Sequence, residues 1–257
     1  RLIINIPPRH MKSLSTAVIL PAWAWTRNAN MKFMYASYAA SLSIRDSTKC
    51  RRLIESPWYQ AHFPDIKLTD DQNQKSRFEN TSSGYRLATS VGGAATGDGG
   101  DIVLIDDPAS SSDAQSSAMR TSVMEWWDQT MQTRLNDPKT GAFIIIAQRL
   151  HEQDLCGHIL SQELGNDWDH LMLPARYEIG HPTPVRSSLG FTDPRTKEGD
   201  LLWPDRMDEK TVSNLEQSLG SYAAAGQLQQ RPSPKGGGIL KAEWWVPWES
   251  DDLPDIE

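Results

Sequence analysis

Apolar strand-like runs alternate with helix-like stretches along most of the chain. The apolar runs occupy residues 2–6, 32–36, 102–105 and 142–147. Apolar positions at helical spacing predict helices over residues 12–27, 39–55, 114–135 and 152–164. Continuous apolar strands joined by helices are typical of parallel sheets that are covered on both faces. The pattern therefore predicts an α/β fold with a mainly parallel central sheet flanked by helices.

Two stretches depart from this alternation. Residues 76–90 hold two short alternating runs, RFEN and YRLATS, around Ser82, Ser83 and Gly84, which predicts a β-hairpin. After Ala175 the pattern weakens, and the Pro-, Gly- and charge-rich residues 178–200 predict a loop excursion. A helix is expected over 206–230, followed by the linker-like RPSPKGGG.

The first strand runs directly into the loop IPPRHMKS, and a helix is expected to follow. Backbone N–H groups at a helix N-terminus form a receptor for phosphate, so Lys12 would reach the β- and γ-phosphates and the Ser13 hydroxyl would ligate Mg²⁺. Arg9 would add positive charge. The general pattern G-x-x-x-x-G-K-[ST] has glycines where this chain has Ile6 and Met11. Alone, the loop is about as compatible with an ordinary strand–loop–helix.

The segment DIVLIDDP is a second apolar strand, and it ends in two adjacent carboxylates. Asp106 would complete the metal site directly or through water, and Asp107 is placed to orient an attacking water as a base. Buried strands often end in acidic turn residues, so this segment alone is a moderate signal. Together, in this order, the two segments favour a nucleoside triphosphate held with a metal ion.

A third strand end, after AFIIIA, carries Gln148 and Arg149. Open α/β sheets place their ligand crevice at such ends, where a polar side chain can sense the γ-phosphate. A solvated strand end with a surface arginine is an equally good interpretation.

Composition narrows the functional classes. A formal charge of −7 argues against a basic module that coats nucleic acid, although a motor with a local basic patch remains compatible. Cys50 and Cys156 stand apart, without metal-ligand or redox spacing. No apolar run is long enough for a membrane span. Because the first residues already form a core strand without a starting Met, we expect a fragment of a longer protein.

Several blocks of sequence resemble the large subunit of the tailed-phage DNA-packaging terminase. PPRHMKS is similar to that family's PPRHGKS loop, GYRLATSVGGAATGDGGDIVLIDDP to its acidic-strand segment, and QRLHEQDL to its coupling segment TRWHEDDL. LLWPDRM and AGQLQQRPSPKGGGILKAEWW resemble the segment leading towards its nuclease domain. The order of the blocks matches along nearly the whole chain.

The resemblance implies a P-loop NTPase that uses ATP and Mg²⁺ to drive double-stranded DNA into a procapsid. It implies as partners the terminase small subunit, the portal protein and further copies in a ring, with no membrane, in the host cytoplasm. The expected division is a P-loop ATPase core at 1–175 whose N-terminal part is missing, a linker or lid subdomain at 176–230, and at 231–257 a connection to an absent RNase H-like nuclease domain. The full-length protein would then also be an endonuclease.

The resemblance also assigns roles to residues. The nucleotide-binding loop comprises Pro8, Arg9, His10, Met11, Lys12 and Ser13. The catalytic residues are Asp107, Lys12 and Arg9, the metal ligands are Ser13 and Asp106, and the coupling residues are Gln148 and Arg149.

Three positions depart from the family pattern. Met11 replaces a glycine, Gln148 replaces a threonine, and Asp98 stands where many relatives carry an arginine. If that arginine acts on a neighbouring subunit, Arg149 or Arg120 is expected to supply its charge here. Met11 and Gln148 keep open the alternative of a nucleotide-binding assembly module with impaired hydrolysis from a degenerate prophage. A helicase-like ATPase is a further alternative, because the same nucleotide site would serve it.

Overall fold

The computed structural model describes residues 1–93, 97–162, 165 and 167–233. These residues contain an eight-stranded sheet in the order β3-β4-β5-β2-β6-β7-β1-β8. The strands are β1 Leu2–Asn5, β2 Phe33–Ser37, β3 Leu68–Asn73, β4 Arg77–Asn80, β5 Tyr85–Ser90, β6 Ile102–Asp106, β7 Ala142–Ala147 and β8 Asp169–Met172. Neighbouring strands from β5 to β8 are parallel, whereas β3, β4 and β5 pair antiparallel at one edge. The predicted mainly parallel sheet is confirmed.

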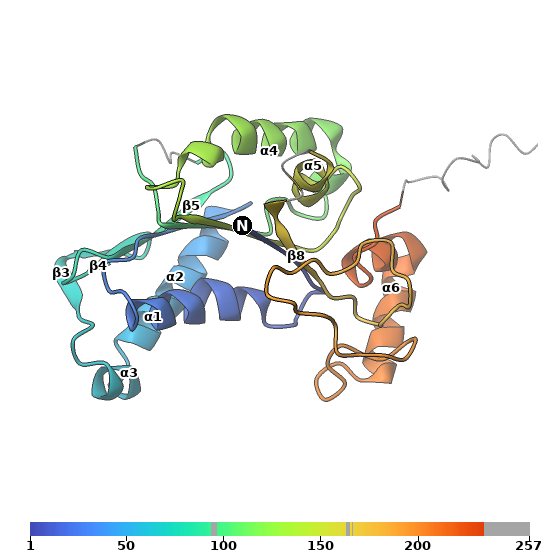
Figure 1. Ribbon diagram of the computed structural model, residues 1–257, viewed down its shortest axis with the longest axis horizontal. Helices are drawn as coiled ribbons and strands as arrows, with labels where there is room; N and C mark the ends of the chain where they lie inside the picture. The colour runs from blue at the N-terminus through green and yellow to red at the C-terminus, as the bar shows by residue number, and fades with distance from the viewer. Residues whose placement is uncertain (94–96, 163–164, 166, 234–257) are drawn as a thin grey trace, which may run out of the picture.

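Helices cover both faces of the sheet (Figure 1). The helices are α1 Leu20–Trp25, α2 Ala40–Ile54, α3 Pro57–His62, α4 Ser117–Gln129, α5 Leu155–Ser161 and α6 Glu209–Gln227. The short helices are the π-helix η1 Leu14–Ile19 and the 3₁₀ turns η2 Asp113–Gln115 and η3 Met131–Thr133. One apolar core packs α4 and α5 on the sheet, and a second packs η1, α1 and α2 on the opposite face.

The hairpin expected around Ser83 is confirmed as β4 and β5. The helix expected over residues 114–135 is shorter, because α4 ends at Gln129 and a separate 3₁₀ turn follows. Three elements were not predicted: α3, β3 and β8. The last two are edge strands, and β3 (LTDDQN) carries too few apolar residues to give a strand pattern.

Helix α6 and the loops that precede it lie beside the β8 edge of the sheet (Figure 1). A small apolar cluster of Ala175, Ala224 and Leu228 holds them there. The expected helix over 206–230 is present but is interrupted at Gly220, which has a φ of 72°. We call residues 176–230, which the sequence predicts to be a linker or lid subdomain, the lid segment. Of the expected connection at 231–257, all but the first three residues lie outside the described part of the chain.

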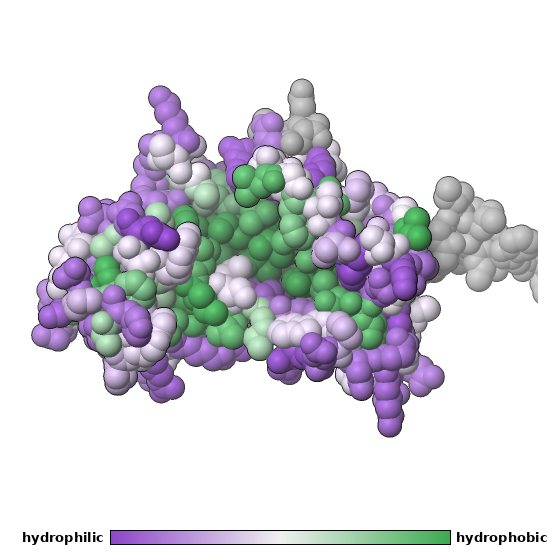
Figure 2. Space-filling model, turned by 60° about the horizontal axis from the view of Figure 1, so that its bottom comes forward, coloured by the Kyte–Doolittle hydropathy of each residue, from purple (hydrophilic) through white to green (hydrophobic). Residues whose placement is uncertain are grey.

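The surface of the molecule is hollowed on the side that lies at the bottom of Figure 1. Figure 2 shows apolar side chains gathered in this hollow inside a hydrophilic rim. Exposed apolar side chains on η1 and α1 include Leu14, Ile19 and Trp23. Within the described residues, every helix is too short or too polar to cross a bilayer.

Candidate nucleotide-binding site

The sheet brings the three predicted segments to one edge. β6, β7 and β1 are adjacent and parallel, and their register pairs Asp106 with Ile146 and Asn5 with Ala147. The predicted phosphate loop, the Asp106–Asp107 pair and Gln148 therefore all leave the sheet at its carboxyl end. Ligands of open parallel sheets bind at this end.

Lys12 and Asp107 are in direct contact across this edge. The Lys12 Nζ lies 2.5 Å from the Asp107 Oδ1, and only 8% of the Lys12 side chain is exposed. Asp107 is fixed by its backbone, because its N–H donates to the Ile146 carbonyl and its own carbonyl accepts from the Tyr38 N–H. The ammonium group therefore lies beside the carboxylate that the sequence assigns to water activation.

A pocket of about 250 Å³ opens beside this ion pair. Its lining includes Ser13, Asp106, Asp107, Tyr38, Arg45 and Gln148. Two predicted metal ligands, Ser13 and Asp106, thus meet in one pocket with the predicted coupling residue Gln148.

Asp106 is a buried carboxylate whose surroundings disfavour its negative charge. Burial and the neighbouring Asp107 carboxylate raise the pKa of Asp106 to about 6, while Lys12 and Ser13 act in the opposite direction. Its Oδ1 is buried and has no hydrogen-bond partner among the described residues. No cluster of three metal-ligating side chains occurs in the described ranges.

The backbone around the site adopts conformations that L-residues rarely take. Arg9 has a φ of 67°, Met11 a φ of 62° and Asp107 a φ of 47°. Such strain persists where surrounding structure enforces it, and it is concentrated at functional sites. The loop thus requires a left-handed residue at position 11, where the general phosphate-loop pattern has glycine. Met11 adopts this conformation against its own preference.

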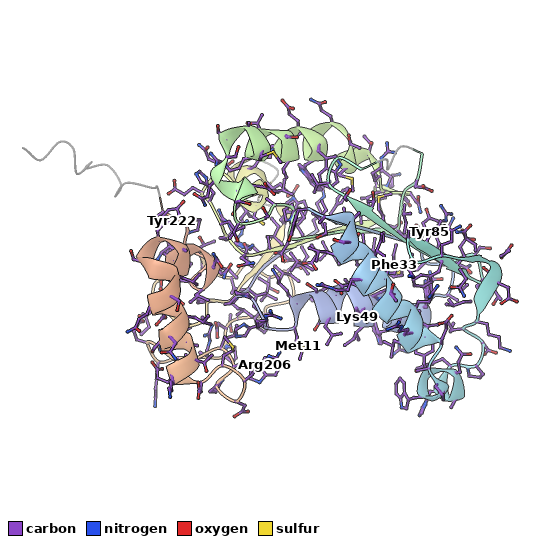
Figure 3. The ribbon with its side chains drawn as sticks, turned by 180° about the vertical axis from the view of Figure 1, so that it is seen from behind. Met11, Phe33, Lys49, Tyr85, Arg206 and Tyr222 are labelled. Atoms are coloured by element: carbon purple, nitrogen blue, oxygen red, sulfur yellow. The ribbon has the colours of Figure 1, made fainter. Side chains whose placement is uncertain are left out.

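The phosphate loop contacts the lid segment. The Arg206 Nε donates a 2.9 Å hydrogen bond to the Arg9 carbonyl, and Figure 3 shows Arg206 close to Met11. The His10 ring is buried near Trp203, at 6.4 Å between ring centroids, and its Nδ1 lies 2.9 Å from the Pro8 carbonyl. Burial lowers the pKa of His10. The sequence marked LLWPDRM as a block but gave no role to Trp203 or Arg206.

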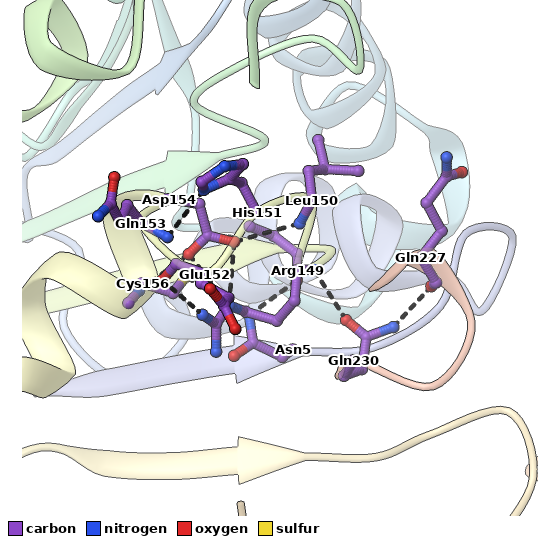
Figure 4. Close-up of polar contacts among 12 residues, drawn as sticks. Asn5, Arg149, Leu150, His151, Glu152, Gln153, Asp154, Cys156, Gln227 and Gln230 are labelled. Atoms are coloured by element: carbon purple, nitrogen blue, oxygen red, sulfur yellow. Dashed lines mark hydrogen bonds and ion pairs between the residues drawn. The ribbon is translucent and has the colours of Figure 1, made fainter. Parts of the chain in front are cut away.

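The two residues predicted at the strand end after β7, Gln148 and Arg149, lie in different surroundings. Gln148 lines the pocket, and its Oε1 is buried without a partner in the described structure. Arg149 turns into the protein, where its Nε lies 3.0 and 2.9 Å from the two carboxylate oxygens of Asp154 (Figure 4). Burial opposes the charge of Arg149, but the ion pair with Asp154 outweighs it and raises the pKa of the guanidinium.

Arg149 is also joined to the end of α6. Its backbone N–H donates a 3.0 Å hydrogen bond to the Oε1 of Gln230, which is 1% exposed and has a φ of 55° (Figure 4). The α6 backbone approaches so closely that a Cβ on Gly226 would lie 2.5 Å from the Arg149 carbonyl. Sequence reasoning missed this junction between the strand end and the lid segment.

The arginines considered as trans-acting groups are engaged within this chain. The Arg149 guanidinium is buried against Asp154, and an Arg120 N–H donates to the Ala114 carbonyl at 2.8 Å. Asp98 forms a 2.8 Å ion pair with Arg77 on β4.

Comparisons with known proteins agree on the fold. No protein-family profile and no curated protein matches the sequence. The large terminase ATPase domain of Thermus phage P74-26 is similar in structure, with a TM-score of 0.59, 10% identity, and coverage of 90% of this chain and 88% of that one. A large terminase from a second, thermophilic bacteriophage, solved in complex with ATP-gamma-S, gives a TM-score of 0.52, 9% identity, and coverage of 89% and 46%.

These similarities cover about 90% of this chain, but less than half of the second terminase. At sequence identities this low, the structural similarity shows the fold alone. The chain therefore has the fold of the ATPase domain of phage large terminases.

Proposed function

We propose that this chain binds ATP with Mg²⁺ and hydrolyses it. The observation that carries the proposal is the contact between Lys12, from the first loop, and Asp107, from the end of β6. A cation and a carboxylate beside a polar pocket supply the two groups that phosphoryl transfer to water requires: one for phosphate charge and one for the nucleophile.

In this proposal Lys12 leaves Asp107 and binds the β- and γ-phosphates when nucleotide enters. Ser13 and Asp106 would hold Mg²⁺, which when bound neutralises charge on the phosphates. Asp107, once released, accepts a hydrogen bond from the attacking water and orients it. Arg9 lies at the exposed side of the loop, where it can approach the phosphates. Gln148 offers an unpaired amide oxygen in the same pocket to a water molecule.

At the level of the whole protein, we propose a motor that moves double-stranded DNA into a procapsid. The fold and the ordered sequence blocks support this assignment. The expected partners are DNA, the terminase small subunit, the portal protein and neighbouring copies in a ring, in the host cytoplasm. The lid segment would respond to nucleotide, and a nuclease domain would belong to the longer protein.

Steady-state ATP hydrolysis tests the enzymatic part. Turnover is expected in the full-length protein and should be lost in both Lys12→Ala and Asp106→Ala. Unchanged turnover in both variants would overturn the proposal. Protection of DNA from nuclease that depends on procapsids then separates packaging from the unwinding expected of a helicase-like ATPase.

A second candidate is a nucleotide-binding assembly module with impaired hydrolysis. The left-handed Met11 favours it, because a side chain at this position crowds the approach of phosphates. Met11→Gly distinguishes the two. A large gain in turnover from a nearly silent parent supports impaired hydrolysis, whereas an active parent with no gain supports a loop adapted to Met11.

A further inference from the structure

Arg86, the second residue of β5, is completely buried. Its guanidinium stacks on the Tyr35 ring at 4.1 Å, and one Nη2–H donates to the Ala17 carbonyl at 3.1 Å. Its Nε and Nη1 are buried and have no hydrogen-bond partner among the described residues. A buried cation with open donors is costly, so these groups indicate a further partner.

A small cavity lies beside Arg86 and shares Ser37, Leu42 and Asp106 with the pocket of the candidate site. Its lining includes Asp46, Asp106, Ser37, Ser43 and Arg86 itself. The cavity has room for about one water molecule, and its polar lining offers the several partners that a buried water requires. Asp106 therefore lines two spaces: the open pocket on one side and this cavity on the other.

The same pair of side chains holds the helix that follows the phosphate loop. The Tyr35 hydroxyl donates to the Thr16 carbonyl at 2.9 Å, next to the bond from Arg86 to Ala17. Both carbonyls belong to the π-helix η1, and the Thr16 hydroxyl donates to the Lys12 carbonyl at 2.7 Å. π-Helical turns are rare and often lie at functional sites. Arg86 is thus connected to both halves of the candidate site.

We propose that Arg86 is a positioning residue of the nucleotide site. It fixes the π-helical turn behind Lys12 through Ala17, and it balances the charge of Asp106 through one water molecule in the cavity. A carboxylate has about four lone-pair positions, enough for this water on one side and a metal ion on the other. The inference rests on the proposed function in one respect, since it assumes that the site binds nucleotide and a metal ion.

The test compares how much Mg²⁺ improves nucleotide affinity in matched variants. ATP-gamma-S is titrated into the chain by calorimetry, once with Mg²⁺ and once with EDTA. In Arg86→Gln the gain due to Mg²⁺ should fall about tenfold, as expected for a lost charge-assisted interaction with the metal ligand. Arg86→Lys, which keeps the charge, should recover most of that gain. Arg77→Gln is the control, since Arg77 also stacks on a tyrosine, Tyr85, at 4.4 Å but lies on β4.

A folded Arg86→Gln variant that keeps the full gain from Mg²⁺ overturns the inference, because a purely structural arginine would change stability alone. If Arg86→Gln does not fold, a high-resolution crystal structure of the unmodified chain decides. A water bonded to both Arg86 and Asp106 supports the inference, and a dry cavity overturns it. Absence of nucleotide binding in the unmodified chain would contradict the proposed function, and the crystal structure would still test Arg86.

Discussion

The Lys12 ammonium lies 2.5 Å from the Asp107 carboxylate, so the proposed phosphate ligand and the proposed base neutralise one another before nucleotide binds. Binding of a triphosphate must separate them. The free energy needed to break this ion pair is therefore subtracted from the free energy of nucleotide binding, and the affinity for nucleotide is lower.

Asp107→Asn should bind ATP-gamma-S more tightly and hydrolyse ATP more slowly. The substitution frees Lys12 and removes a negative charge near the phosphates, so we expect affinity to rise about threefold to tenfold. Turnover should fall by about a hundredfold or more, because the base is lost. Calorimetry and steady-state kinetics measure the two effects. Asp128→Asn, on the outer face of α4, is the control, and weaker binding by Asp107→Asn would contradict the interpretation.

Arg206→Ala should weaken nucleotide binding without destabilising the fold. The Arg206 Nε holds the carbonyl of Arg9, a residue in a left-handed conformation, while the side chain itself is exposed. Loss of one hydrogen bond predicts a drop in affinity of about threefold to tenfold and little change in melting temperature. Lys210→Ala removes a charge nearby in the lid segment and should leave affinity unchanged. Equal affinities for Arg206→Ala and the unmodified chain would exclude this role of the lid contact.

Gln230→Leu should loosen the junction between α6 and the strand end after β7. It leaves the buried N–H of Arg149 without its acceptor, which costs about 1–3 kcal/mol of unfolding free energy. Urea denaturation measures this loss, and hydrogen exchange should become faster at the Arg149 amide. Gln153→Leu is the control, because Gln153 lies close to Arg149 in the sequence and its side chain is exposed. Unchanged protection of the Arg149 amide would show that the bond does not secure the junction.

His170 should make the fold sensitive to acid. Burial lowers the pKa of His170 to about 3, and its Nε2 lies 2.7 Å from the Asn5 Oδ1, consistent with a neutral ring that donates to Asn5. The unfolded chain binds a proton at this ring below about pH 6.5, whereas the folded chain does not. The stability supplied by the neutral ring is therefore complete above pH 6.5 and is lost as the pH falls towards 3.

Comparison with His170→Gln isolates this contribution. Chemical denaturation between pH 7.5 and 5 should show a steeper loss of stability in the unmodified chain than in the variant. Asp106 titrates in the opposite sense, since its raised pKa favours folding at lower pH, but it is present in both proteins and cancels in the comparison. Parallel pH profiles would contradict the assignment.

The sequence predicted those parts of the site that follow directly from strand ends. The strands before Lys12, Asp106 and Gln148 are continuous apolar runs, and parallel pairing alone places their ends at one edge. The phosphate-binding role of Lys12 and Ser13 stays a prediction, made despite Met11 because its chemistry depends on Lys and Ser more than on the glycines.

The supporting contacts could not be read from the sequence. Arg86 lies in the alternating run YRLATS, where an arginine is normally read as a solvent-facing position, yet the helix after the phosphate loop covers it. Gln230 accepts a hydrogen bond from Arg149, which is 81 residues away in the sequence. A local sequence pattern cannot predict a contact between such distant positions. Arg206 reaches the loop only because the lid segment folds back along the β8 edge.

The most direct test of the central claim is the affinity of the chain for ATP-gamma-S in Mg²⁺, measured beside Lys12→Ala and the control Lys75→Ala. If Lys12 binds phosphate, the unmodified chain and Lys75→Ala should bind equally well, and Lys12→Ala should bind at least about tenfold more weakly with an unchanged fold. Equal affinity in all three proteins, or no binding to the unmodified chain, would contradict a nucleotide site at this edge of the sheet.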